Sequence, residues 1–182
     1  EKFPNHEVTV ISRSPISNSR NIDTNFSTRS VFRVIITILK LRNTTFDVLL
    51  VSNVDDFLFH CAIGKKGISS KKKEGDLCTP KGTFSIKNLY YRSDRLLKPQ
   101  TKIIIKKIKK NMGWCNDPKS NKYNSLVTVK EKIRYEKMYR KDHKYDIVVV
   151  IDYNLKKPIP YKGSAIFIHL TNNYKPTAGC IA

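Results

Sequence analysis

The sequence predicts a mainly β domain, mostly antiparallel, with little helix. From Thr44 onward, short runs rich in β-branched and aromatic residues alternate with polar turns, which is the pattern of successive strands. Two runs, 147–151 and 165–170, are almost continuously apolar and are expected to be central strands buried on both faces. With 182 residues, 40% of them hydrophobic, the chain can form one domain with a real core plus an extra segment.

Residues 1–43 differ from the rest and are expected to form a basic, flexible N-terminal segment. Residues 1–30 are rich in Ser, Asn, Arg and Thr and show no sustained periodicity. The apolar run 34–41 is too short to distinguish a strand from a short helix. The folded domain is therefore expected over residues 44–182.

The remaining elements follow from local patterns. Two β-rich runs, 46–51 and 57–63, flank a short polar turn and predict a hairpin. A lysine-rich loop over 64–75 follows. Alternation predicts further strands over 83–90 and 101–109, and the apolar stripe of Ile133 and Met138 among charges predicts a helix over 130–140.

The charge balance favours anionic partners. Lys and Arg number 35 against 15 acidic residues, a net charge of +20, which suits nucleic acid, an anionic lipid surface or an acidic wall polymer. The same excess also follows from a composition rich in Lys, Asn and Ile. Aromatic residues do not interleave with the lysine clusters at 71–73 and 106–110, so these are interpreted as solvated faces and no specific nucleic-acid binding is expected.

Four cysteines and four histidines limit the chemistry. Cys61, Cys78, Cys115 and Cys180 form no CxxC pair, and the other histidines lack metal-ligand spacing, so no metal site is expected. If Cys180 stays free, at most one disulfide can form among the other three. No apolar stretch approaches the roughly 20 residues that a transmembrane helix needs.

The C-terminal segment carries the strongest chemical signal. His169 ends an apolar run and Cys180 follows eleven positions later, after a loop long enough to reverse the chain. An imidazole beside a thiol can take its proton and later protonate a leaving amine. Gly179 and Cys180 are expected to supply backbone N–H groups to an oxyanion hole, and Thr177 to place a hydroxyl near the thiolate or substrate.

Two further loops hold residues of interest. The first, 74–84, contains two glycines and a proline and on its own predicts a surface turn. The second, 113–118, holds the single tryptophan, Trp114, followed by Cys115 and Asn116, with Tyr123 downstream. It is interpreted either as a turn anchored by Trp114 or as a rim that binds a polar ligand through Trp114, Asn116 and Tyr123.

Three segments in this order resemble the L,D-transpeptidase catalytic domain, the YkuD-like family, in the branch with a short His-to-Cys loop. The resemblance extends from about Phe46 to Ala182, roughly three quarters of the chain. The segments are Gly64 with Glu74-Gly75-Asp76 and Thr79-Pro80-x-Gly82-x-Phe84, then Gly113-Trp114-Cys115-Asn116-Asp117-Pro118 with Tyr123-Asn124, and Gly163 to His169 with Pro176-Thr177-Ala178-Gly179-Cys180.

The resemblance implies a β-sandwich-like fold and an enzyme that cross-links peptidoglycan stem peptides. Cys180 would attack the carbonyl of the third stem residue and expel D-alanine, and an amine of a neighbouring stem would resolve the thioester. His169 would be the general base and acid, with the Leu170 carbonyl as its orienting group. The resemblance implies no cofactor, and a location in the periplasm or cell wall.

This sequence departs from the family in two places. Ala178 and Ala182 stand near positions where the better-known branch has His and Arg. The chain also ends two residues after Cys180, whereas family domains continue, so the resemblance allows for a domain truncated at its C-terminus. Oligomeric state is left open.

Three alternative functions stay open at this stage. Water instead of an amine could resolve the acyl-enzyme, which would make the protein an L,D-carboxypeptidase. In other classes, the chain could be a non-catalytic wall-binding module or a nucleic-acid-binding module.

Overall fold

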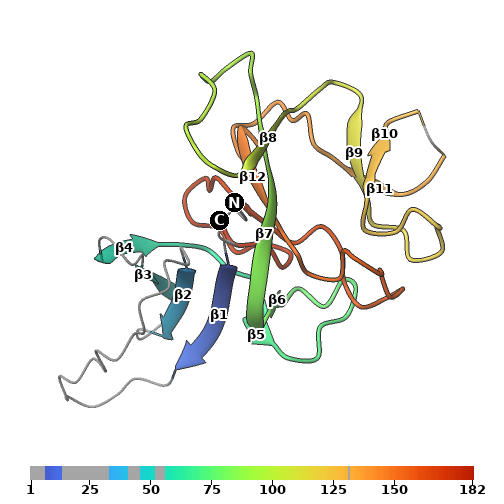
Figure 1. Ribbon diagram of the computed structural model, residues 1–182. Helices are drawn as coiled ribbons and strands as arrows, with labels where there is room; N and C mark the ends of the chain where they lie inside the picture. The colour runs from blue at the N-terminus through green and yellow to red at the C-terminus, as the bar shows by residue number, and fades with distance from the viewer. Residues whose placement is uncertain (1–6, 14–32, 41–45, 52–55, 131) are drawn as a thin grey trace, which may run out of the picture.

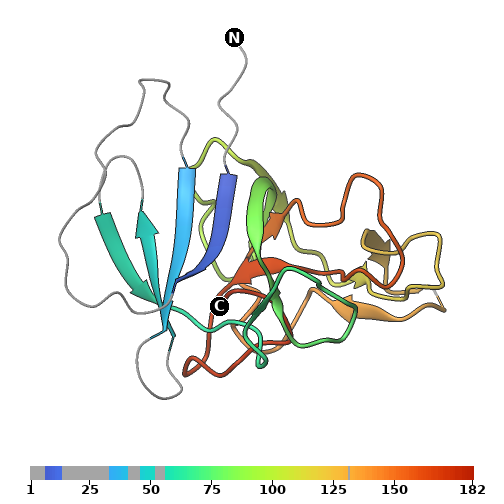
Figure 2. The same cartoon turned by 90° about the horizontal axis from the view of Figure 1, so that it is seen from below.

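A computed structural model describes residues 7–13, 33–40, 46–51, 56–130 and 132–182, with side chains from Cys61 onward. The described residues form strands and turns and contain no helix, which confirms the mainly β prediction. Figures 1 and 2 show the long strand β7 (Gly82–Tyr91) running through the middle of the molecule. Crossing a bilayer would need a long apolar helix, and the described part of the chain has none.

The largest sheet is organised around β7. Its strand order is β13-β12-β7-β1-β2-β3-β4, with β8 paired to β7 outside this path. The first half of β7 pairs with β1 and the second half with β12 and β8. The bounds are β1 Glu7–Arg13, β2 Arg33–Lys40, β3 Phe46–Val51, β4 Asp56–His60, β8 Ile104–Lys107, β12 Ile147–Ile151 and β13 Phe167–His169.

Two smaller sheets complete the fold. One has the order β10-β9-β11 and lies to one side of β7 (Figure 1), and the other is the short pair β5-β6. Their bounds are β5 Ile68–Ser69, β6 Thr79–Pro80, β9 Met112–Cys115, β10 Leu126–Thr128 and β11 Tyr135–Lys137.

Several predicted elements agree with the structure. The hairpin is confirmed, because β3 and β4 pair antiparallel with Val51 opposite Asp56. The strands predicted over 83–90 and 101–109 correspond to β7 and the shorter β8. The ambiguous run 34–41 contains most of strand β2. Within the segment expected to be flexible, residues 7–13 also form a strand, β1, and pair with β2 and β7. The rest of residues 1–32 lies outside the described part of the chain.

The helix predicted over 130–140 is wrong. Residues 135–137 form β11, which pairs with β9 so that Tyr135 stands opposite Cys115. Ile133 and Met138 are five positions apart, which is not the spacing of one helical face. In this pairing the Tyr135 ring packs directly against Gly113. A Cβ on Gly113 would lie 2.6 Å from the ring, so the packing depends on a glycine at that position.

The prediction of two central strands holds for β12 and fails for β13. β12 lies between β7 and β13, with Val148 and Val150 fully buried. β13 ends the strand order. Its outer edge is covered by the C-terminal residues, because Ile168 forms an isolated parallel bridge with Ile181. A short returning segment thus takes the place of a further strand at this edge.

Candidate active site

The C-terminal loop returns to the sheet and places Cys180 beside the end of β13. Ile181 donates to the carbonyl of Phe167 (2.9 Å) and accepts from the amide of His169 (3.0 Å). On the other side, Thr177 donates its amide to Ile63 (2.8 Å), and Ala182 donates to Ala62 (2.8 Å). The segment is therefore fixed along both edges by backbone hydrogen bonds.

Thr177 and Gly179 shape the turn that precedes the thiol. The Thr177 hydroxyl donates to the carbonyl of Cys180 (2.6 Å) and accepts from the amide of Gly179 (3.1 Å). Gly179 has φ +145°, and a Cβ there would lie 2.8 Å from the carbonyl oxygen of Cys78. A side chain cannot be accommodated at this position without a backbone shift.

This turn changes the expected oxyanion hole. The Gly179 N–H is already used by Thr177, so it does not point freely at a substrate. The Cys180 N–H has no acceptor among the residues that the structure describes. The Thr177 hydroxyl serves the turn, not the thiol.

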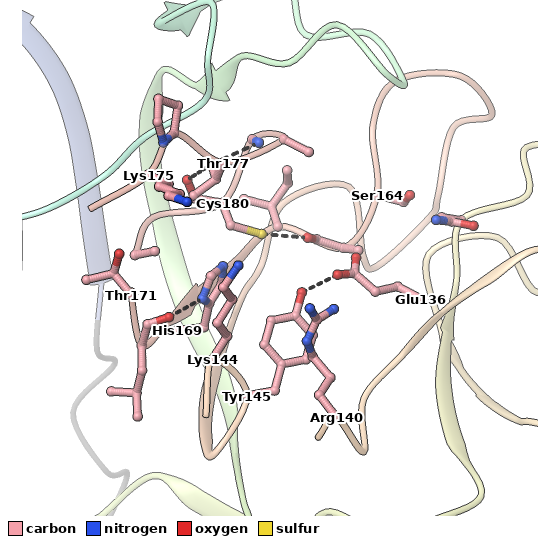
Figure 3. Close-up of a pocket in the computed structure, with 18 of the residues that line it drawn as sticks. Glu136, Arg140, Lys144, Tyr145, Ser164, His169, Thr171, Lys175, Thr177 and Cys180 are labelled. Carbon is pink, nitrogen blue, oxygen red and sulfur yellow. Dashed lines mark hydrogen bonds between the residues drawn. The ribbon is translucent and has the colours of Figure 1, made fainter. Parts of the chain in front are cut away.

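The thiol of Cys180 is buried at the wall of a cavity of about 310 Å³. Its Sγ donates to the carbonyl of Ala165 at 3.2 Å, as the dashed line in Figure 3 marks. Burial and, to a lesser extent, the nearby charge of Glu136 raise the pKa of the thiol to about 12, against the lowering effect of a hydrogen bond from the Phe167 backbone and of the Lys72 charge. The resting group is a neutral thiol.

The imidazole of His169 lines the same cavity (Figure 3). Its Nδ1 lies 2.7 Å from the carbonyl of Leu170, which as an acceptor requires the proton on Nδ1 and leaves Nε2 as a free base. The ring packs edge-on against Tyr145, with centroids 5.0 Å apart. Burial lowers the pKa of His169 from its usual 6.5, so the ring is neutral at pH 7.

Acidic and basic side chains form the rest of the wall. Tyr145 donates its hydroxyl to Glu136, whose pKa is raised by burial. Arg140 stacks over the Tyr145 ring at 5.0 Å and pairs with Asp142 at 2.7 Å. The cavity is also lined by the cations Lys72, Lys144 and Lys175 and by Glu74 and Asn116.

A buried hydrogen-bond network supports the segment that carries Ala165. The Asn124 side-chain oxygen accepts from the indole of Trp114 (2.9 Å) and from the amide of Ala165 (3.0 Å). Tyr123 donates to Glu74 (2.5 Å) and accepts from the Gly163 amide (3.0 Å). The motif loops therefore hold the segment of Ala165, whose carbonyl accepts the hydrogen bond from the thiol.

The predicted rim residues occupy different places. Trp114 and Tyr123 are 4% and 3% exposed and are not among the side chains that line the cavity. Asn116 does line it, and its side-chain oxygen accepts from Arg134 at 3.2 Å. The first two residues thus act as supports in this structure, and only Asn116 is available to a ligand in the cavity.

Sequence analysis missed Lys72, Glu136 and Tyr145, and named Asn124 only as part of a motif, without a role. Lys72 stands in a lysine run that was interpreted as a solvated face, yet its side chain is 4% exposed and paired with Asp76 at 2.5 Å. The acid four positions later was the available signal for this pair. No local pattern singles out Glu136 or Tyr145, because the pairing of β11 with β9 brings Glu136 to the cavity, and the turn before β12 brings Tyr145 there.

All four cysteines are free thiols in this structure. Among the described residues, no group of three or more His, Cys, Asp or Glu side chains is placed to hold a metal ion. What the cavity offers is a thiol, a neutral imidazole, a backbone N–H and several cations. These are the parts of a cysteine-dependent acyl-transfer site.

Comparison with known families agrees with this chemistry. The sequence model of the YkuD family, described as the L,D-transpeptidase catalytic domain, matches residues 36–182. Neither the comparison with curated proteins nor that with solved structures found a match.

Proposed function

Because the chain belongs to the L,D-transpeptidase catalytic domain family, which acts on peptidoglycan, we propose that it cross-links stem peptides through a Cys180 acyl-enzyme. The observation that carries this proposal is the shared cavity of Cys180 and His169, in which the Leu170 carbonyl orients the imidazole. By the same family membership, we propose a location in the periplasm or cell wall.

The first half-reaction forms a thioester. His169 Nε2 takes the thiol proton as Sγ attacks the carbonyl carbon of the third stem residue. The oxyanion is stabilised by the Cys180 N–H. The C–N bond then breaks, and the imidazolium gives its proton to the leaving nitrogen of D-alanine.

The second half-reaction transfers the acyl group. The side-chain amine of a neighbouring stem attacks the thioester carbonyl, and His169 takes the proton that the amine loses. The C–S bond breaks as the amide bond forms, and the proton returns to the sulfur. The catalyst is then restored without an external cofactor.

The cationic wall supports an anionic substrate. Lys144 and Lys175 line the cavity, and the charge of Lys144 also acts on nearby Asp142, whose closer partner is Arg140 at 2.7 Å. Stem peptides carry free carboxylates, so ion pairing with these lysines would orient the donor stem. This role extends the proposal to substrate binding.

A specific observation favours one competing function, a non-catalytic wall-binding module. The thiol donates to the Ala165 carbonyl, not to the imidazole, and burial raises its pKa to about 12. For catalysis the thiol must exchange this carbonyl for His169 Nε2. If it never does so, the chain retains only a basic, peptide-binding cavity.

Acylation by a carbapenem separates these functions. We expect the intact mass of the wild-type protein to rise by one adduct, mapped to Cys180, and the Cys180→Ala variant to gain none. An adduct of equal yield on that variant, or none on the wild type, would refute the proposal. Product analysis with a stem tetrapeptide, with and without an acceptor stem, then separates transfer from hydrolysis by a carboxypeptidase.

A further inference from the structure

Lys72 is a buried cation in the active-site cavity that the mechanism above does not use. Its side chain is 4% exposed, and its Nζ donates to Asp76 at 2.5 Å and to the carbonyl of Lys73 at 2.8 Å. An ammonium has three N–H donors, so these two bonds leave one donor for a further acceptor. A lysine is rarely buried unless it is paired, and here the pair lies at a reactive cavity.

The position of Lys72 relative to the thiol is fixed by two glycines. A Cβ on Gly179, the residue before Cys180, would lie 3.6 Å from Lys72 Cε. A Cβ on Gly163 would lie 3.0 Å from Lys72 Cγ and 3.3 Å from its Cε. The lysine stem thus fills the space between the turn that carries the thiol and the segment that carries the Ala165 carbonyl.

Asp76 holds the ammonium in this place. Besides Lys72, its carboxylate accepts from the amides of Lys73 (2.7 Å) and Cys78 (2.9 Å). Burial acts to raise the pKa of Asp76, but the hydrogen bonds from Lys72 and the two amides outweigh it and lower the pKa. The carboxylate is therefore ionised, and the cation has a fixed partner.

We propose that Lys72, held by Asp76, is a positioning residue that stabilises the Cys180 thiolate as it forms. The geometry points to this role because the ammonium lies beside the turn of the nucleophile, within a buried cavity where charges interact strongly. The proposal deepens the proposed function, on which it rests for its biological meaning. The thiol's ionisation itself can be measured without any substrate.

Other charges also face this thiol and set the balance. Glu136 acts against ionisation, and the cavity further contains His169, Arg140, Lys144, Lys175 and Glu74. Lys72 differs from the other lysines of the cavity in being buried and held by Asp76. Its effect on the thiolate is accordingly expected to resist added salt, since buried charges are screened little.

The test is the rate of alkylation of Cys180 by iodoacetamide between pH 6 and 10, mapped by peptide mass spectrometry. We expect Lys72→Met to slow the reaction at pH 8 by about tenfold, which corresponds to about one pKa unit, and Lys72→Arg to restore most of it. Lys87→Met is the matched control, because Lys87 also pairs with an acid, Asp152 (3.1 Å), but does not line the cavity.

A second variant separates electrostatics from damage to the fold. Asp76→Asn removes the opposing charge but keeps the side-chain oxygen that accepts from Lys72 Nζ, so the ammonium stays in place and we expect faster alkylation, opposite to Lys72→Met. Cys115 is 0% exposed and should stay unmodified in every folded variant. Equal rates in Lys72→Met and wild type with Cys115 protected, or slower alkylation in both variants, would overturn the proposal. Carbapenem acylation can fail while this pattern holds, so the two proposals fail separately.

Discussion

The protonation state of His169 determines whether its imidazole can accept a proton in the cavity. Burial lowers its pKa from 6.5, and the bond from Nδ1 to Leu170 leaves Nε2 as an acceptor. Because the Cys180 pKa is raised to about 12, the resting site holds a neutral thiol and a neutral ring, not an ion pair. In the proposed reaction, proton transfer therefore has to accompany the attack on the substrate.

The first prediction is the pH dependence of acylation. The active ring is unprotonated, so the rate should stay constant near neutral pH and fall as the pH drops through the lowered pKa of His169, about tenfold per pH unit. Stopped-flow or mass-resolved acylation by a carbapenem measures it. A rate that does not fall at any acidic pH at which the protein stays folded would contradict the assignment of His169 as base.

The second prediction concerns the residue before the thiol. Gly179→Ala puts a Cβ 2.8 Å from the Cys78 carbonyl in a left-handed backbone, and we expect a loss of about 1–3 kcal/mol in unfolding free energy. Gly67→Ala is the control, because Gly67 has φ +83° and no atom within 4 Å of the added Cβ. Denaturant unfolding compares them. Equal losses would show that the close approach of the added Cβ to the Cys78 carbonyl costs nothing beyond the strain of the positive φ.

At the scale of elements, the loop between β9 and β10 supports the site from outside the cavity. Asn124 is 2% exposed and joins Trp114 of β9 to the backbone of Ala165, and its amide also donates to Tyr153 (3.0 Å) and Asn154 (2.7 Å). One side chain thus connects three segments. Loss of the Asn124 side chain would release the segment of Ala165, whose carbonyl accepts the hydrogen bond from the thiol.

The third prediction follows from this connection. Asn124→Ala leaves buried donors without acceptors, each costing about 1–3 kcal/mol, and we expect both a lower melting temperature and slower Cys180 acylation. Asn116→Ala serves as the comparison for melting, since in the described part of the chain the Asn116 side chain bonds to Arg134 alone, at the wall of the cavity. Should the two variants melt together, the supporting role of Asn124 would be wrong.

At the scale of the whole molecule, we expect the net positive charge to favour the approach to the proposed substrate, the wall polymer. The net charge of +20 includes exposed lysines around the cavity mouth, such as Lys175. Exposed charges are screened as ionic strength rises.

The fourth prediction is that binding to purified peptidoglycan weakens several-fold between 50 and 500 mM NaCl, measured by co-sedimentation. Binding independent of salt would exclude an electrostatic contribution.

The sequence predicted well those features that depend on local pattern. Alternation located β7, and the apolar run 147–151 located β12. It failed where long-range pairing decides, as at β11, where the partner strand β9 supplies the hydrogen bonds that a helix would have made internally. The same holds for β13. Its outer edge is covered by residues 180–182, which reach it only after the loop that follows the strand, and no local pattern indicates this contact.

The same distinction applies to the site. His169 and Cys180 could be predicted as a pair because their spacing is a sequence feature, and the structure places both in one cavity. Lys72 and Glu136 were not predicted, because loop packing buries Lys72 and the pairing of β11 with β9 brings Glu136 to the cavity. Trp114 and Tyr123 belong to recognisable motifs, yet their side chains face the core. A motif therefore indicates that a residue matters, and only the fold shows whether it meets a ligand or supports the residues that do.

The central claim is that Cys180 is acylated with the help of His169. The most direct measurement is the yield of thioester on Cys180 after mixing with a stem tetrapeptide, by mass spectrometry of wild type and His169→Gln. The account predicts an adduct that lacks D-alanine on the wild type, formed at least about 100-fold more slowly in the variant. Equal rates in both proteins, or an adduct only on Cys61, Cys78 or Cys115, would contradict it.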